Sequence, residues 1–146
     1  MIVTLLRRVQ AWTGPKPAWW NLVPNKPLLD FNGQPMWAEF IVLRELEADG
    51  WQGVWIDGWR RAYFRNPDQV AEVPASVGGL IDRIAQRTGR HGGCWDICAW
   101  RGDELRFIEL KQRDRDELRS PQLAWREAAI AEGVAASAFT IVEWAR

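Results

Sequence analysis

The chain has 146 residues, with 19 basic residues, 19 acidic residues and 11 tryptophans. A chain of this length forms one domain and buries roughly 70% of the surface that its unfolded form exposes, so it needs no disulfide or metal ion in order to fold. The balanced charge excludes a global basic field of the kind that attracts nucleic acid, so any basic surface must come from local arrangement. No apolar run reaches the roughly 18 residues of a membrane span, and the N-terminal charges follow the apolar residues, the reverse of a signal peptide. We therefore expect a cytoplasmic protein without a membrane contact.

Residues 1–35 carry most of the prolines, which predicts an irregular N-terminal arm with a short strand or helical turn at 2–9. Such an arm either wraps its own domain or reaches a partner subunit. Trp19 and Trp20 stand among these prolines and are candidates for packing against the domain, for base stacking or for a homodimer contact. Residues 36–146 are expected to form the domain itself, with an insertion at about 66–90.

The domain is predicted to contain three helices. Apolar residues recur at helical spacing over 37–49 and over 76–88. Ser120 and Pro121 are the residue types that begin a helix, as N-cap and first helical residue, and this third helix ends before Gly133. The intervening segments read as strands, so we expect an α/β (α+β) fold.

The first predicted hairpin spans 51–64. Aromatic and β-branched residues stand on both sides of Asp57–Gly58, the dipeptide typical of a two-residue type I′ turn. Asp57 is therefore interpreted as a turn former rather than as a metal ligand. A final strand is expected at 138–144.

The second predicted hairpin, 94–111, sets a register. If Gly102–Asp103 is a two-residue type II′ turn, the sequence numbers of residues that face each other across the hairpin have a constant sum. A four-residue loop centred on the same point gives the same pairs, whereas a three-residue loop would give different ones. Asp96 then faces Glu109, and Cys94 faces Lys111. The cysteines, Cys94 and Cys98, lie roughly 13 Å apart on one strand, too far for a disulfide, and are expected to be reduced core residues.

The register places an acid pair and a lysine on one face of the hairpin. Directly opposed carboxylates have Cβ atoms about 5 Å apart and repel each other, so Asp96 and Glu109 need a compensating charge. A divalent cation with oxygen ligands supplies it. Lys111, on the same face, could lower the pKa of a water or hold charge that develops on a phosphate. The alternative is an acid pair and a lysine on a solvated sheet face. The chain has only three lysines among its basic residues, so a lysine at this position favours a functional role for its compact ammonium charge over a solvated face.

At these residues the sequence resembles the PD-(D/E)XK nuclease superfamily, and within it the virus-type replication-repair nuclease (VRR-NUC) group. The resemblance covers Met36 to Trp144 and depends on an ordered set of motifs: Glu39 on the first helix, Gly92-Gly93-Cys94-Trp95-Asp96, Phe107-Ile108-Glu109-Leu110-Lys111, and Ser120-Pro121-Gln122-Leu123-Ala124-Trp125. It implies a restriction-endonuclease-like core, a mixed central sheet flanked by helices in the order αββαββαβ. Trp95 stands where the family has proline, and the 66–90 insertion and the Trp-rich arm are not part of the family core.

The resemblance implies a role for each site residue. Asp96 and Glu109, with the backbone carbonyl of Leu110, would bind Mg²⁺ or Mn²⁺, and Lys111 would orient or activate the attacking water. The reaction would be metal-assisted hydrolysis of DNA phosphodiester bonds. By family analogy the substrate is branched DNA and the protein acts as a homodimer. Two further residues complete the catalytic set: Glu39 would assist at the metal or its waters, and Gln122 would position the lysine, water or phosphate.

Contacts with DNA are assigned to residues around the site. Arginines near the first hairpin and the second helix could form a basic track for the DNA backbone or a solvated face, and the one histidine is a solvent-exposed loop residue or a phosphate contact. The candidates are Arg60, Arg61, Arg90, His91 and Ser120. Two other functions remain compatible with the sequence: a catalytically inactive nuclease-fold module that binds nucleic acid or a protein partner, and an unrelated Trp-rich binding domain, for example for carbohydrate.

Overall fold

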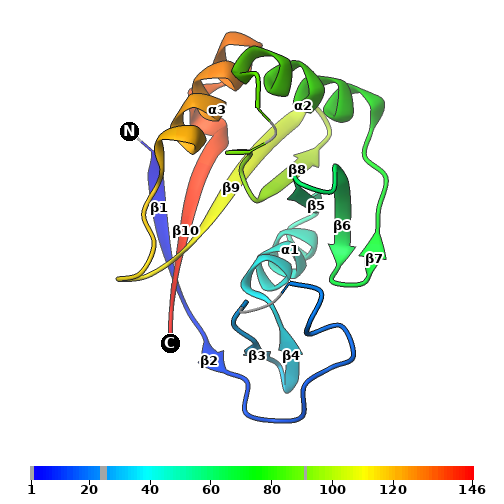
Figure 1. The fold of residues 1–146 in the computed structure, drawn as a ribbon, viewed down its shortest axis with the longest axis vertical. Helices are drawn as coiled ribbons and strands as arrows, with labels where there is room; N and C mark the ends of the chain where they lie inside the picture. The colour runs from blue at the N-terminus through cyan, green and yellow to red at the C-terminus, as the bar shows by residue number, and fades with distance from the viewer. Residues whose placement is uncertain (1, 24–25, 91) are drawn as a thin grey trace.

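A mixed seven-stranded sheet organises the chain (Figure 1). The computed structural model describes residues 2–23, 26–90 and 92–146, so the predicted contact His91 lies outside the described residues. In spatial order the strands are β1 (Val3–Arg8), β10 (Phe139–Ala145), β9 (Glu104–Gln112), β8 (Ile97–Arg101), β5 (Gln52–Asp57), β6 (Ala62–Asn66) and β7 (Gln69–Val70). The first three run parallel to one another and the remaining neighbours pair antiparallel.

Helices cover both faces of the sheet, which confirms the predicted class of a mixed sheet flanked by helices. The helices are α1 (Ala38–Ala48), α2 (Ala75–Thr88) and α3 (Ser120–Ala131), and a 3₁₀ turn (Ala136–Ala138) leads into β10. A small sheet of β2 (Gln10–Ala11), β3 (Leu29–Phe31) and β4 (Gln34–Met36) lies beside α1 at the end of the molecule opposite α2 and α3 (Figure 1). No helix among the described residues is long and apolar enough to cross a membrane.

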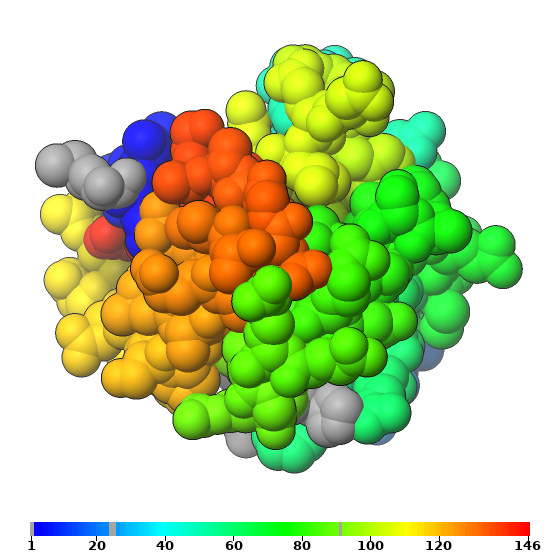
Figure 2. All heavy atoms as spheres, turned by 90° about the horizontal axis from the view of Figure 1, so that it is seen from above, coloured from blue at the N-terminus to red at the C-terminus, as the bar shows by residue number. Residues whose placement is uncertain are grey.

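The alternation of side chains along β8 and β9 divides the core in two. Ile97, Ala99, Ile108 and Leu110 pack with α1, whereas Cys98 and Phe107 pack with α2 and α3 on the other face. This is the division that the hairpin register predicts. The space-filling view shows α2 and α3 side by side over their face of the sheet (Figure 2).

The N-terminal residues are more regular than the sequence indicates. Within the segment predicted as an irregular arm, β1 forms an edge of the central sheet, parallel to β10, and β2 and β3 join the small sheet. Val3, Leu5 and Leu6 of β1 are each more than half exposed. An exposed apolar edge strand is a surface on which a second chain can pair. The homodimer stays a prediction that sedimentation velocity can test.

The first hairpin differs from its prediction in the turn. Asp57 pairs with Ala62, so the loop has four residues, 58–61, and not the two of a type I′ turn. The Oδ1 of Asp57 accepts hydrogen bonds from the backbone N–H groups of Trp59 and Arg60, and Arg61 takes the positive φ of 52°. The interpretation of Asp57 as a turn former is confirmed, but its side chain builds a longer turn than the Asp-Gly dipeptide suggests.

Candidate active site

The second hairpin forms in the predicted register. Cys98 pairs with Phe107 and Arg101 with Glu104, and Gly102 has a φ of 57°, as the first position of a type II′ turn requires. The described ladder between β8 and β9 ends at Ile97, one residue before Asp96. The first strand of the hairpin, predicted to begin at residue 94, therefore begins three residues later, and Asp96 lies just before it.

Beyond the end of the ladder, the carboxylates of Asp96 and Glu109 connect the two chain segments by side-chain hydrogen bonds. The backbone N–H of Asp96 donates to Glu109 Oε2 at 3.1 Å, and the backbone N–H of Leu110 donates to Asp96 Oδ2 at 2.9 Å. Each carboxylate thus accepts a hydrogen bond from the opposite strand, which holds both acids at the point where the strands separate. Because the strand begins only at Ile97, Trp95 turns to the α3 face, where its Nε1 donates to the backbone carbonyl of Gln122 at 3.0 Å, instead of lying on the predicted opposite face.

Gln122 connects the acid pair to the lysine. Its Nε2 donates to Glu109 Oε1 at 2.6 Å, and its Oε1 accepts from Lys111 Nζ at 3.0 Å. The same Oε1 also accepts from the backbone N–H of Arg119 at 2.9 Å. Arg119, not Ser120, is the N-cap of α3, so the predicted cap is wrong by one residue. The helix end is closed by Gln122, whose amide at the same time holds Lys111.

Lys111 and Glu109 are buried charged residues, 7% and 3% exposed, and their Nζ and Oε1 lie 3.4 Å apart. A buried lysine costs free energy unless its charge is compensated, and here a carboxylate and an amide oxygen compensate it. The ammonium group is thereby held at a fixed place beside the acid pair.

A third carboxylate reaches the same end of the sheet from α1. Glu39 is 6% exposed and its Oε1 lies 2.7 Å from Lys26 Nζ. Lys26, Glu39, Asp96, Glu109 and Leu110 together line a cavity of about 190 Å³. The sequence interpretation missed Lys26. The scarcity of lysine was the available signal, because two of the three lysines, Lys26 and Lys111, contact this acid cluster.

Burial and repulsion by a neighbouring carboxylate raise the pKa of each member of the acid pair. Burial is the main cause of the rise for both carboxyls. The charge of Glu39 further raises the pKa of Asp96, and the charge of Asp96 further raises the pKa of Glu109. Burial, the largest single influence, would lower the pKa of Lys26, but the ion pair with Glu39 and the charges of Asp96 and Glu109 together raise it. A cation at this cavity would favour the ionised form of both carboxyls and would lower their pKa values.

The oxygen atoms at this cavity are of the type that bind a divalent cation. Among the described residues no group of three His, Cys, Asp or Glu side chains is arranged to hold a metal ion. The expected ligand set is smaller, namely two carboxylates and the Leu110 carbonyl, and Mg²⁺ commonly uses one or two carboxylates and keeps several waters. In addition, Glu39 Oε2 is buried and has no hydrogen-bond partner among the described residues, which leaves it able to accept from a metal-bound water.

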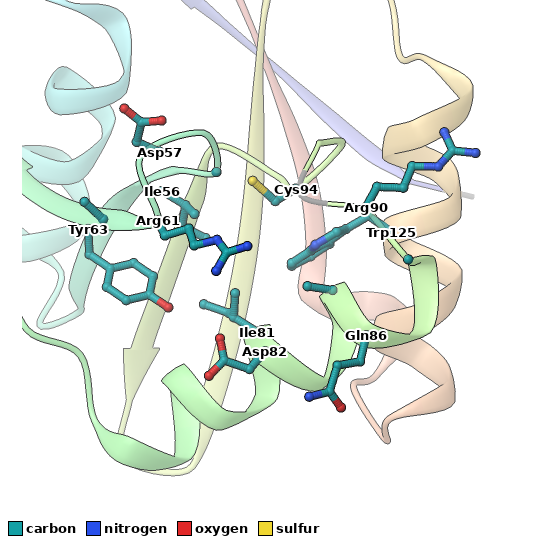
Figure 3. Close-up of a pocket in the computed structure, with 14 residues that line it drawn as sticks. Ile56, Asp57, Arg61, Tyr63, Ile81, Asp82, Gln86, Arg90, Cys94 and Trp125 are labelled. Atoms are coloured by element: carbon teal, nitrogen blue, oxygen red, sulfur yellow. The ribbon is translucent and has the colours of Figure 1, made fainter.

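Two of the candidate DNA contacts line a second cavity, of about 570 Å³, next to the β5–β6 loop. Arg61 and Arg90 line it from opposite sides, and the guanidinium of Arg90 points away from Arg61 (Figure 3). Arg60 is bound within the chain, through an ion pair with Asp57 and a hydrogen bond to the Leu22 carbonyl at 3.0 Å. Ser120 is exposed at the start of α3.

The cysteines are free, as expected. Cys98 is fully buried in the core, and Cys94 is half-buried and lines the second cavity (Figure 3). Burial is the main reason why the pKa of each thiol is raised to about 12. Both thiols therefore stay protonated at neutral pH and are poor nucleophiles.

The backbone at Gly93, three residues before Asp96, packs closely against Pro121 at the start of α3. We therefore predict that Gly93→Ala destabilises the fold. Gly93 has a φ of +84°, and a Cβ there would lie 2.5 Å from the Pro121 backbone oxygen. The strain alone should lower the free energy of unfolding by about 1–3 kcal/mol, measured by urea denaturation. Gly92→Ala is the matched control, since a Cβ at Gly92 meets nothing within 4 Å. Equal stability of the two variants would contradict this role of Gly93.

Comparison with known proteins finds no match: no family model, no curated protein and no solved structure is similar to the chain.

Proposed function

We propose that this protein is a Mg²⁺- or Mn²⁺-dependent nuclease of the PD-(D/E)XK type that hydrolyses DNA phosphodiester bonds. The observation that carries the proposal is the connected set Asp96, Glu109, Gln122 and Lys111, in which a buried lysine is bound to the same amide as one carboxylate of an acid pair. A solvated sheet face would not bury a lysine and a glutamate together, because both would lose their hydration.

Each residue of the set has a chemical task. Asp96 and Glu109, with the Leu110 carbonyl, would hold the cation, which when bound acts as a Lewis acid and lowers the pKa of its water. Lys111 places a positive charge where the phosphate becomes more negative and where a water can be oriented for attack. Gln122 keeps the Lys111 ammonium in position, and Glu39 would accept a hydrogen bond through its unpartnered Oε2.

DNA is the proposed substrate, with branched DNA as the preferred structure. Arg61 and Arg90 line the second cavity together with Cys94, which is two residues before Asp96, and Arg60 precedes Arg61 in the β5–β6 loop, so a DNA backbone that follows these arginines could reach the acid pair. Their charges are local, in agreement with a chain whose net charge is zero.

A cleavage assay separates this proposal from the inactive-module alternative. The purified protein with Mn²⁺ should cut at least one substrate in a panel of single-stranded, duplex, flap and four-way-junction DNA, and EDTA should stop the reaction. If the protein binds members of the panel but leaves all of them intact, the inactive module is the correct function. If it neither binds nor cuts, both forms of the proposal are wrong.

A further inference from the structure

Trp59 is 91% exposed, more than any other large apolar side chain among the described residues. It stands in the four-residue loop 58–61 that joins β5 to β6, here called the Trp59 loop. The other tryptophans of comparable interest are better covered: Trp19 packs edge-on against Trp37, and Trp20 is 40% exposed. An exposed aromatic ring is the type of side chain on which nucleic-acid bases stack.

The Trp59 loop is held in place by its own hydrogen bonds. Asp57 Oδ1 accepts from the backbone N–H groups of Trp59 and Arg60, both at 3.1 Å. Arg60 returns to Asp57 Oδ2 at 3.3 Å and donates to the Leu22 carbonyl at 3.0 Å, so the loop is tied to the N-terminal segment. A fixed loop loses little conformational entropy when its tryptophan binds a ligand.

The Trp59 loop flanks the acid pair. The backbone N–H of Ile56 donates to the Asp96 carbonyl at 2.8 Å, which places the end of β5 directly beside the first residue of the acid pair. Trp59 follows Ile56 by three residues, a chain length that reaches at most about 11 Å. A nucleic-acid strand advances about 3.4 Å per nucleotide, so the backbone of Trp59 is only a few nucleotide lengths from the backbone of Asp96, and the indole side chain extends from there.

We propose that Trp59 stacks on an unpaired base of a DNA strand whose phosphate lies at Asp96 and Glu109, so that the preferred substrate has single-stranded character beside the cleaved bond. This inference rests on the proposed nuclease function. Stacking on an aromatic ring needs a base with a free face, which a base inside a duplex does not offer. Two arginines, Arg60 and Arg61, follow Trp59 directly in the chain, and arginines next to an aromatic ring are typical of a surface that binds single-stranded nucleic acid.

Binding to two DNA probes tests the inference independently of cleavage. Fluorescence anisotropy is measured with a short labelled single strand and with a blunt duplex of the same sequence, with Ca²⁺ as the cation and with strand integrity checked on a gel. Trp59→Ala should weaken binding of the single strand by about 5- to 100-fold, the range expected for one base on one aromatic ring, and should change duplex binding less than about twofold. Trp59→Phe should retain most of the affinity, and Trp20→Ala, which removes another exposed indole, should bind like the wild type.

A strand with one abasic position identifies the stacked base. Removing the base that contacts Trp59 should weaken binding to the wild type by about the same factor as Trp59→Ala, and should have no further effect on Trp59→Ala. The inference is wrong if Trp59→Ala binds the single strand like the wild type, if the single strand and the duplex weaken equally, or if neither probe binds. If Trp59→Ala weakens single-strand binding as expected but the wild type cuts no substrate, the nuclease function is rejected and the stacking contact is retained.

Discussion

Lys111→Ala should reduce DNA cleavage by at least about 100-fold while leaving DNA binding within a few-fold of the wild type, since a positioned charge at the reacting group typically contributes a factor of that size to the rate. The ammonium group of Lys111 is buried, lies 3.4 Å from Glu109 Oε1 and donates to Gln122 Oε1 at 3.0 Å. No other basic side chain among the described residues contacts both of these groups. The measurement is the single-turnover rate of cleavage with Mn²⁺.

Two further variants separate catalysis from folding. Lys16→Ala is the matched control, because Lys16 lies over the Trp20 ring, away from the acid pair, and it should cleave like the wild type. Lys111→Arg keeps the positive charge but replaces a compact ammonium with a planar fork, so it should stay folded and remain strongly impaired. Full activity of a folded Lys111→Arg protein would show that only the charge matters, and full activity of Lys111→Ala would remove Lys111 from the mechanism.

Asp96→Asn should abolish stabilisation by Mn²⁺ and should not destabilise the protein in EDTA. A ligand at about 100 times its dissociation constant stabilises a folded protein by about 2.7 kcal/mol, which for a chain of this size raises the melting temperature by roughly 5–10 °C. The wild type should show such a rise. In the variant, asparagine still accepts the hydrogen bond from the Leu110 N–H but lacks the charge that would hold the cation.

The direction of the effect in EDTA follows from the charges around Asp96. Its carboxylate is repelled by Glu39 and is buried, so its removal should leave the melting temperature unchanged or higher. Asp103→Asn, at the exposed turn between β8 and β9, is the matched control and should keep the full response to Mn²⁺. A response to Mn²⁺ that is equal in Asp96→Asn and the wild type would place the cation elsewhere.

The candidate site is predictable from the sequence where it depends on local patterns. The turn at Gly102–Asp103 and the alternation along β9 place Glu109 and Lys111 on one face, and the structure has that register. The pattern does not give the strand ends. Because the ladder stops at Ile97, the Asp96 carboxylate accepts a hydrogen bond from the backbone N–H of Leu110, and Trp95 lies on the other face of the sheet.

Contacts between distant segments needed the tertiary structure. Lys26 reaches Glu39 from a proline-rich segment whose sequence indicates no partner, and β1 joins the sheet beside β10 although its own residues read equally as a strand or a helical turn. Similarly, Asp57–Gly58 predicts a short turn, and only the paired strands show a longer loop that leaves Trp59 in solvent.

The sequence by itself therefore determined the three helices, the register of the second hairpin and the balanced charge that makes any basic surface a local one. Periodicity, turn chemistry and composition are properties of residues near one another in the chain. The tertiary structure decided which of the eleven tryptophans are core, which lysines meet the acid pair, and that Gln122 bonds to both Lys111 and Glu109. Those outcomes depend on which segments pack together to bury apolar surface and satisfy buried polar groups, a choice made over the whole chain and not within any one segment.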